Sequence, residues 1–189
     1  LKMSASWSTD NGAAKGATSR VENSWGLGAT YVTSAGDTAL TIGGGLSGSE
    51  VAVLDTQSAA DDGGFTLGVS AVTGDLTVAV GYADGDTTRG VGSNTNIQTD
   101  ADVVKAGIKY VTGDLTMNVG FVSGTAVDNI FAGTDTVEDS HEEVNASVTY
   151  AVASGVSAVL GFTTVDQSDE NASSTTGGSS WYIGATMSF

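Results

Sequence analysis

The chain has 189 residues, enough for one domain, and carries six basic against 22 acidic side chains, a net charge of −16. This balance argues against a nucleic-acid partner, because phosphate binding needs clustered Lys and Arg. Without cysteine there are no disulfides and no thiolate metal sites. The sequence contains no run of about 18 apolar residues, so it predicts no transmembrane helix. Membrane-spanning β-strands are not detected in this way, because their apolar residues alternate with polar ones.

Apolar residues alternate with small or polar ones in ten segments, which is the two-residue period of β-strands. The predicted strands cover, in order, residues 1–7, 25–31, 40–46, 65–71, 76–82, 104–110, 115–121, 144–150, 156–162 and 181–189. Four are followed by short Gly-containing turns, at 34–37, 73–75, 112–114 and 153–155. Longer polar stretches, which we expect to be loops, fill 8–23, 47–64, 84–101, 124–142 and 166–179.

The segments form a repeat of one hairpin and one long connection. The string Val-Thr-Gly-Asp-Leu-Thr occurs twice, with Gly74 and Gly113 separated by 113 − 74 = 39 residues. Because the strands reverse at every connection, all short turns lie at one end and all long connections at the other. This asymmetry is typical of outer-membrane barrels, which have short periplasmic turns and long extracellular loops.

Aromatic residues occupy both ends of the outward face of these strands. About six residues at ~3.3 Å each separate the two rows, which suits a tilted strand crossing the outer membrane. A soluble β-sandwich would leave both rows unexplained. We therefore expect a single all-β domain, a transmembrane antiparallel up-and-down β-barrel. The membrane-interface aromatics are Trp7, Trp25, Phe65, Tyr82, Phe121, Phe162 and Trp181 at the long-loop end, and Tyr31, Tyr110, Tyr150 and Phe189 at the turn end.

The opposite face carries mostly Gly, Ser and Thr, together with a few charged residues that would be costly against lipid. We expect this face to line a water-filled pore. Lys105 and Lys109 lie about 13 Å apart on one strand, where they could polarise passing solutes or merely pair with carboxylates. The predicted pore-lining residues are Lys2, Lys105, Lys109, Asn118, Glu143, Asn145 and Tyr182.

The acidic stretches suggest calcium ligation, since Ca²⁺ prefers several carboxylate oxygens. None has EF-hand spacing, and solvated loops have the same composition. His141 is the only histidine, so a hydrolytic site could form only around it, in a stretch that we expect to be a loop. The candidate metal ligands are Asp100, Asp102, Glu138, Asp139 and Glu142.

Alternating strands, acidic loops, Gly-Asp turns and a terminal aromatic strand ending in Phe189 resemble the general porins of Gram-negative bacteria, particularly the alphaproteobacterial, Rhodobacter-like type. The resemblance implies no enzymatic activity but a homotrimer of 16-stranded barrels for passive diffusion of ions and small hydrophilic solutes. It also implies contact with outer-membrane lipid and lipopolysaccharide, extracellular long loops, a periplasmic C-terminus and calcium in some loops.

Residues 1–7 align with the strands that directly follow Gly-Asp turns. We therefore expect residues 1–189 to be the C-terminal ten strands of a longer porin. The alternative is a complete ten-stranded outer-membrane barrel with a loop-borne activity, either protease-like or adhesive.

Overall fold

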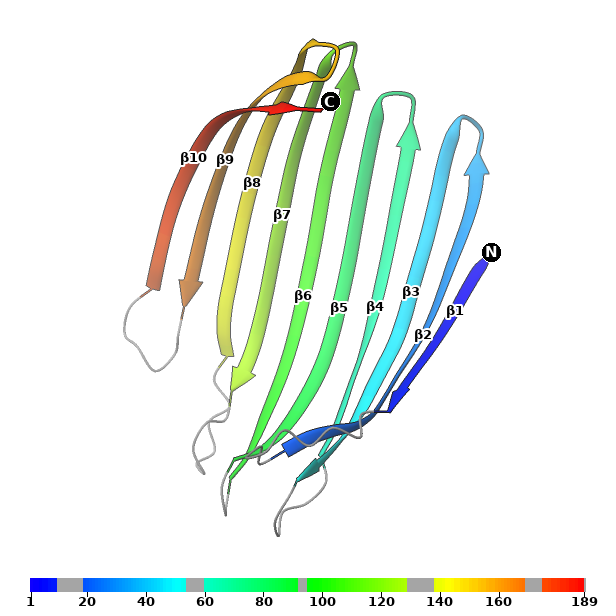
Figure 1. Ribbon diagram of the computed structural model, residues 1–189, viewed down its shortest axis with the longest axis vertical. Helices are drawn as coiled ribbons and strands as arrows, with labels where there is room; N and C mark the ends of the chain where they lie inside the picture. The colour runs from blue at the N-terminus through cyan, green and yellow to red at the C-terminus, as the bar shows by residue number, and fades with distance from the viewer. Residues whose placement is uncertain (10–18, 54–59, 92–94, 129–137, 169–174, 189) are drawn as a thin grey trace.

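The computed structural model describes residues 1–9, 19–53, 60–91, 95–128, 138–168 and 175–188, which form one antiparallel sheet (Figure 1). Its ten strands pair in chain order, which confirms the all-β up-and-down fold. In these parts of the chain, no helix is long and apolar enough to cross a membrane. The strands are β1 (Lys2–Thr9), β2 (Ser19–Ala35), β3 (Thr38–Val53), β4 (Ala60–Thr73), β5 (Leu76–Val91), β6 (Thr95–Thr112), β7 (Leu115–Asp128), β8 (Glu138–Ala153), β9 (Val156–Ser168) and β10 (Thr175–Met187).

The sheet is a single curved layer, and β1 and β10 are its two edges (Figure 1). It has no apolar core of its own, because none of the described side chains is fully buried. Large apolar side chains are exposed instead, including Ile183 at 75% and Trp181 at 73%. This much exposed apolar surface would be unfavourable in water and suits contact with lipid.

Tight turns join the strands in pairs at one end of the sheet. Gly36, Gly74 and Gly113 have φ between 55° and 59°, a left-handed conformation that costs glycine nothing. Each is followed by Asp in a two-residue turn, the length that favours such backbone angles in hairpins. Adjacent hairpins are joined by backbone hydrogen bonds, for example from Val111 N to Asp75 O at 2.9 Å.

The strands extend further into the polar stretches than the sequence pattern predicts. The expected loop 84–101 is wrong for most of its length, because β5 continues to Val91 and β6 begins at Thr95. The other four expected loops also contribute residues to strands. Ladder pairing uses backbone groups, so it continues where the apolar alternation that identified the strands has ended.

Candidate pore wall

The predicted interface aromatics share one face of the sheet, which we call the outer face. Residues directly opposite each other in a ladder point to the same side, and Trp7 pairs with Trp25 while Phe162 pairs with Trp181. The rings of Phe65 and Tyr82 lie 5.6 Å apart between centroids. Phe189 lies outside the described residues.

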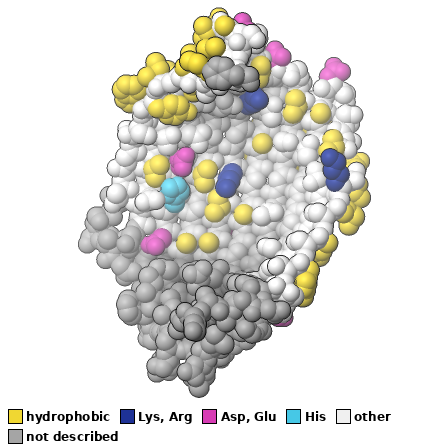
Figure 2. All heavy atoms as spheres, in the orientation of Figure 1, with side chains coloured by type: hydrophobic (Ala, Val, Ile, Leu, Met, Phe, Trp, Pro, Cys, Tyr) yellow, Lys and Arg dark blue, Asp and Glu magenta, His cyan; other side chains and the backbone are white. Residues whose placement is uncertain are grey.

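The predicted pore-lining residues share the other face, here called the inner wall. One ladder runs from Lys109 through Asn118, Ser147 and Gly161 to Tyr182. Asn118 Nδ2 donates a hydrogen bond to Ser147 Oγ at 3.3 Å. The charged side chains on this face are few and scattered (Figure 2), so the wall is mainly backbone and small polar groups.

Tyr182 lies flat against the inner wall. A Cβ on Gly161, directly opposite in the ladder, would collide with the Tyr182 ring. Glycine at this position therefore lets the ring cover the backbone of β9 instead of projecting into the space in front of the sheet.

The lysines and carboxylates of the inner wall occupy different strands. Lys105 on β6 and Glu143 on β8 lie in one ladder with Val122 between them. Glu143 Oε1 accepts a hydrogen bond from Asn145 Nδ2 at 3.3 Å, and its Oε2 lies 3.9 Å from His141 Nε2. Within the described part of the chain, neither Lys105 nor Lys109 forms an ion pair. Both lysine side chains are exposed.

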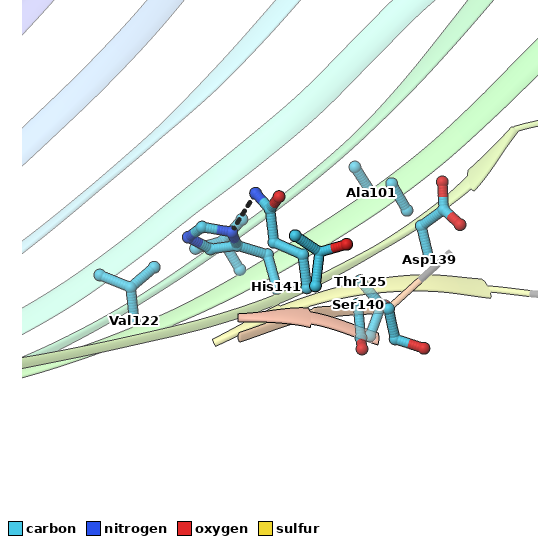
Figure 3. Close-up of a pocket in the computed structure, with 12 residues that line it drawn as sticks. Ala101, Val122, Thr125, Asp139, Ser140 and His141 are labelled. Atoms are coloured by element: carbon cyan, nitrogen blue, oxygen red, sulfur yellow. Dashed lines mark hydrogen bonds between the residues drawn. The ribbon is translucent and has the colours of Figure 1, made fainter. Parts of the chain in front are cut away.

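His141 lies on the inner wall in β8, so its placement in a loop was wrong. Its Nδ1 is hydrogen-bonded to Nε2 of Gln167 at 3.0 Å, beside a hollow of about 570 Å³ (Figure 3). The adjacent Ser140 points to the outer face, where it pairs with Thr125. The described contacts of His141 therefore include no serine that it could activate.

The five candidate metal ligands do not converge. Asp100, Asp102 and Glu142 lie on the outer face, whereas Asp139 lies on the inner wall. Glu138 belongs to β8, and its side chain lies outside the described set. Among the residues with described side chains, no group of three or more His, Cys, Asp or Glu is arranged to hold a metal ion.

An outward-facing acidic cluster lies just beyond Tyr82. The sequence marked two of its members, Asp100 and Asp102, as candidate metal ligands, but it did not predict that they lie opposite Asp84 and Asp86 on a paired strand. Asp84 pairs with Asp102, and Asp86 pairs with Asp100. Asp86 raises the pKa of Asp100 above its ordinary value most strongly, followed by loss of hydration and by Asp84. The apolar alternation ends at Tyr82, so hydropathy does not show that β5 continues. If the strand is extended in phase, its two-residue period places Asp84 and Asp86 on the same face as Tyr82, and this parity is the only sign of the cluster in the sequence.

The sequence of residues 1–171 matches the family model described as Gram-negative porin. The chain belongs to the Gram-negative porins. This family places it in the bacterial outer membrane as a transmembrane β-barrel protein. No curated protein has a sequence that matches this porin.

Solved outer-membrane proteins have the same fold. OmpT of Vibrio cholerae in its trimer form is 16% identical, with a TM-score of 0.58, over 89% of this chain and 56% of that one. An OmpT loop L8 deletion mutant gives 17% identity and a TM-score of 0.57, over 89% and 53%. OccAB4 of Acinetobacter baumannii gives 15% and 0.56, over 88% and 46%. The chain thus spans about half the length of these structures.

Proposed function

We propose that this porin forms a water-filled pore for passive diffusion of ions and small hydrophilic solutes across the outer membrane. The observation that carries the proposal is the two-faced sheet. Its outer face is uncharged between two aromatic rows, and its inner wall is small, polar and lysine-bearing. A wall of this kind selects solutes by width and lining charge and needs no covalent step.

The ten strands belong, in this proposal, to the C-terminal part of a larger, 16-stranded barrel. The open edges at β1 and β10 support this idea, because unpaired backbone groups are costly in lipid. The coverage of about half of each solved neighbour also supports it.

The proposed assembly is a homotrimer surrounded by lipid and lipopolysaccharide, with long loops outside the cell and the short turns and C-terminus in the periplasm. Family membership and the trimer form described for one neighbour support this arrangement. The resemblance to Rhodobacter-like porins also leads us to propose calcium at acidic loops, although the five ligands named above do not form one site.

Conductance of the full-length protein in planar lipid bilayers tests the pore. Replacing Lys105 and Lys109 together with Glu should raise the permeability ratio of cations to anions about twofold or more, because lining charge sets the local ion concentration. Reversal potentials in a salt gradient measure this ratio. Unchanged potentials would show that the two lysines do not face the ion path.

A further inference from the structure

The inner wall is divided into a basic and an acidic part. Among side chains described on the strands, its cations are Lys2 on β1 and Lys105 and Lys109 on β6. Its carboxylates, Asp139 and Glu143, lie on β8 beside His141. The charged side chains described on strands β1 to β6 of this wall are therefore all positive, although the chain as a whole is strongly acidic.

A hollow of about 820 Å³ lies in this positive part, with Lys2 and Lys105 among its lining residues. A single ladder connects the two lysines through Thr30, Gly43, Gly68 and Gly81. Five interstrand steps of ~4.8 Å put the two lysine backbones ~24 Å apart along the curved wall. No acidic residue lines the hollow, and neither lysine has an ion-pair partner in the described part of the chain.

The glycines at the centre of the hollow are not required by the fold. A Cβ on Gly68 would lie 3.5 Å from Val80 O, and a Cβ on Gly81 would lie 3.6 Å from Leu67 O. Both distances are ordinary van der Waals contacts, and neither glycine has a positive φ. Because Gly68 and Gly81 have no side chains, space remains between Lys2 and Lys105.

The remaining lining can bind hydroxyl groups. Thr30, Thr66 and Ser4 contribute hydroxyls to the hollow, and the glycine strands contribute backbone. The volume lies within the ~300–1,000 Å³ range of small-molecule sites. A solute that suits this lining carries hydroxyls along its length and a negative charge at one or both ends.

We propose that this hollow is a binding subsite for hydroxylated anions of monosaccharide size, such as sugar phosphates. The idea rests on the proposed pore and refines it by naming a solute class. Acidic residues elsewhere favour cations, while the subsite between Lys2 and Lys105 retains anions during passage. Its occupation partly blocks the ion current.

Block of ionic current by glucose 6-phosphate, with glucose as the uncharged control, tests the subsite in the full-length protein in planar bilayers. Glucose 6-phosphate should block saturably and at lower concentration than glucose. Replacing Lys105 or Lys2 with Gln should raise the half-blocking concentration of glucose 6-phosphate about two- to fivefold, the effect of one exposed ion pair. K105R should restore the wild-type value.

Lys109→Gln is the matched control, because Lys109 shares the strand and face of Lys105 but does not line the hollow. It lies ~13 Å from Lys105, beyond the ~10 Å Debye length in 0.1 M salt. K109Q should therefore change the half-blocking concentration less than about 1.5-fold. If K105Q and K109Q change the half-blocking concentration equally, the overall charge of the lumen explains the block, and the proposal of a subsite is overturned.

Filling the hollow provides a second variant that keeps all charges. Gly81→Leu should weaken block by glucose 6-phosphate, whereas Gly184→Leu on β10, where a Cβ meets nothing within 4 Å, should not. Equal block in both variants would contradict the subsite. Absence of any ion conductance would instead refute the pore itself, whereas conductance with no difference between glucose and glucose 6-phosphate would refute only the anion subsite.

Discussion

At the scale of single residues, the acidic cluster beyond Tyr82 sets like charges directly opposite each other. Asp84 faces Asp102 and Asp86 faces Asp100, while Asp102 also accepts a hydrogen bond from Thr125 Oγ1. Facing like charges destabilise a ladder. We therefore expect repulsion between these carboxylates to destabilise the pairing of β5 with β6 at neutral pH, at the strand ends that lie away from the tight turns.

Asp100→Asn should stabilise these strand ends in a pH-dependent way. Asp86 raises the pKa of Asp100 in the folded state, so the folded state favours the protonated carboxyl. The paired strand ends therefore lose stability in the wild type as the pH rises through that pKa. At pH 7 the variant should exchange the amides of residues 84–86 and 100–102 up to about fivefold more slowly than wild type. Below pH 3.8, the ordinary pKa of this carboxyl, the difference should vanish.

Hydrogen–deuterium exchange mass spectrometry of the full-length protein measures this effect, with rates corrected for the intrinsic pH dependence. Asp37→Asn is a suitable control, because Asp37 follows Gly36 in a turn at the opposite end of the sheet. A D100N effect of the same size at pH 7 and at pH 3 would contradict the charge explanation.

At the scale of strands and turns, the left-handed glycines fix where each hairpin reverses. Gly113, with φ 56°, has open space where a Cβ would stand, so replacement is opposed by backbone conformation rather than by a clash. Gly113→Val should destabilise the protein by about 1–2 kcal/mol, the cost of a left-handed β-branched residue.

The free energy of unfolding, from urea titration of the full-length protein in vesicles, measures this cost. Gly184→Val serves as the control, because Gly184 lies in β10 without a positive φ and with open space around its Cβ position. The prediction fails if both valines have the same effect on unfolding.

The sequence predicts those features of the strands that depend on local side-chain alternation, and it does not predict those that depend on pairing between strands. Side-chain parity is local, so alternation correctly identified the ten strands, and it gave the faces of Lys105 and Trp181 that the ladders show. The ends of the strands depend on backbone pairing with a neighbouring strand. Hydropathy does not show this pairing where the paired residues are polar, as Asp84 and Asp100 are. The hollow between Lys2 and Lys105 was unpredictable, because it depends on the register of six strands.

At the scale of the whole molecule, the open sheet requires a partner for each edge. β1 pairs with β2 and β10 pairs with β9, and within the described residues the strand order does not close β1 onto β10. In a bilayer both edges must find hydrogen-bond partners. A 16-stranded barrel provides these partners from other strands, whereas a ten-stranded barrel must join β1 directly to β10.

Cysteine cross-linking distinguishes the two closures, and residues 1–189 contain no native cysteine that would compete with the introduced pairs. Ser4→Cys with Gly28→Cys should cross-link under oxidation, because Ser4 Oγ lies 2.9 Å from the Cβ position of residue 28. Ser4→Cys combined in turn with Ser180→Cys, Gly184→Cys or Thr186→Cys should not, because in the larger barrel β1 and β10 are separated by further strands. All of these positions lie on the inner wall, where the proposed water-filled pore would give a water-soluble oxidant access to each of them. Efficient cross-linking of any β1–β10 pair, read as altered mobility of the full-length protein in non-reducing gels, would establish the ten-stranded barrel instead.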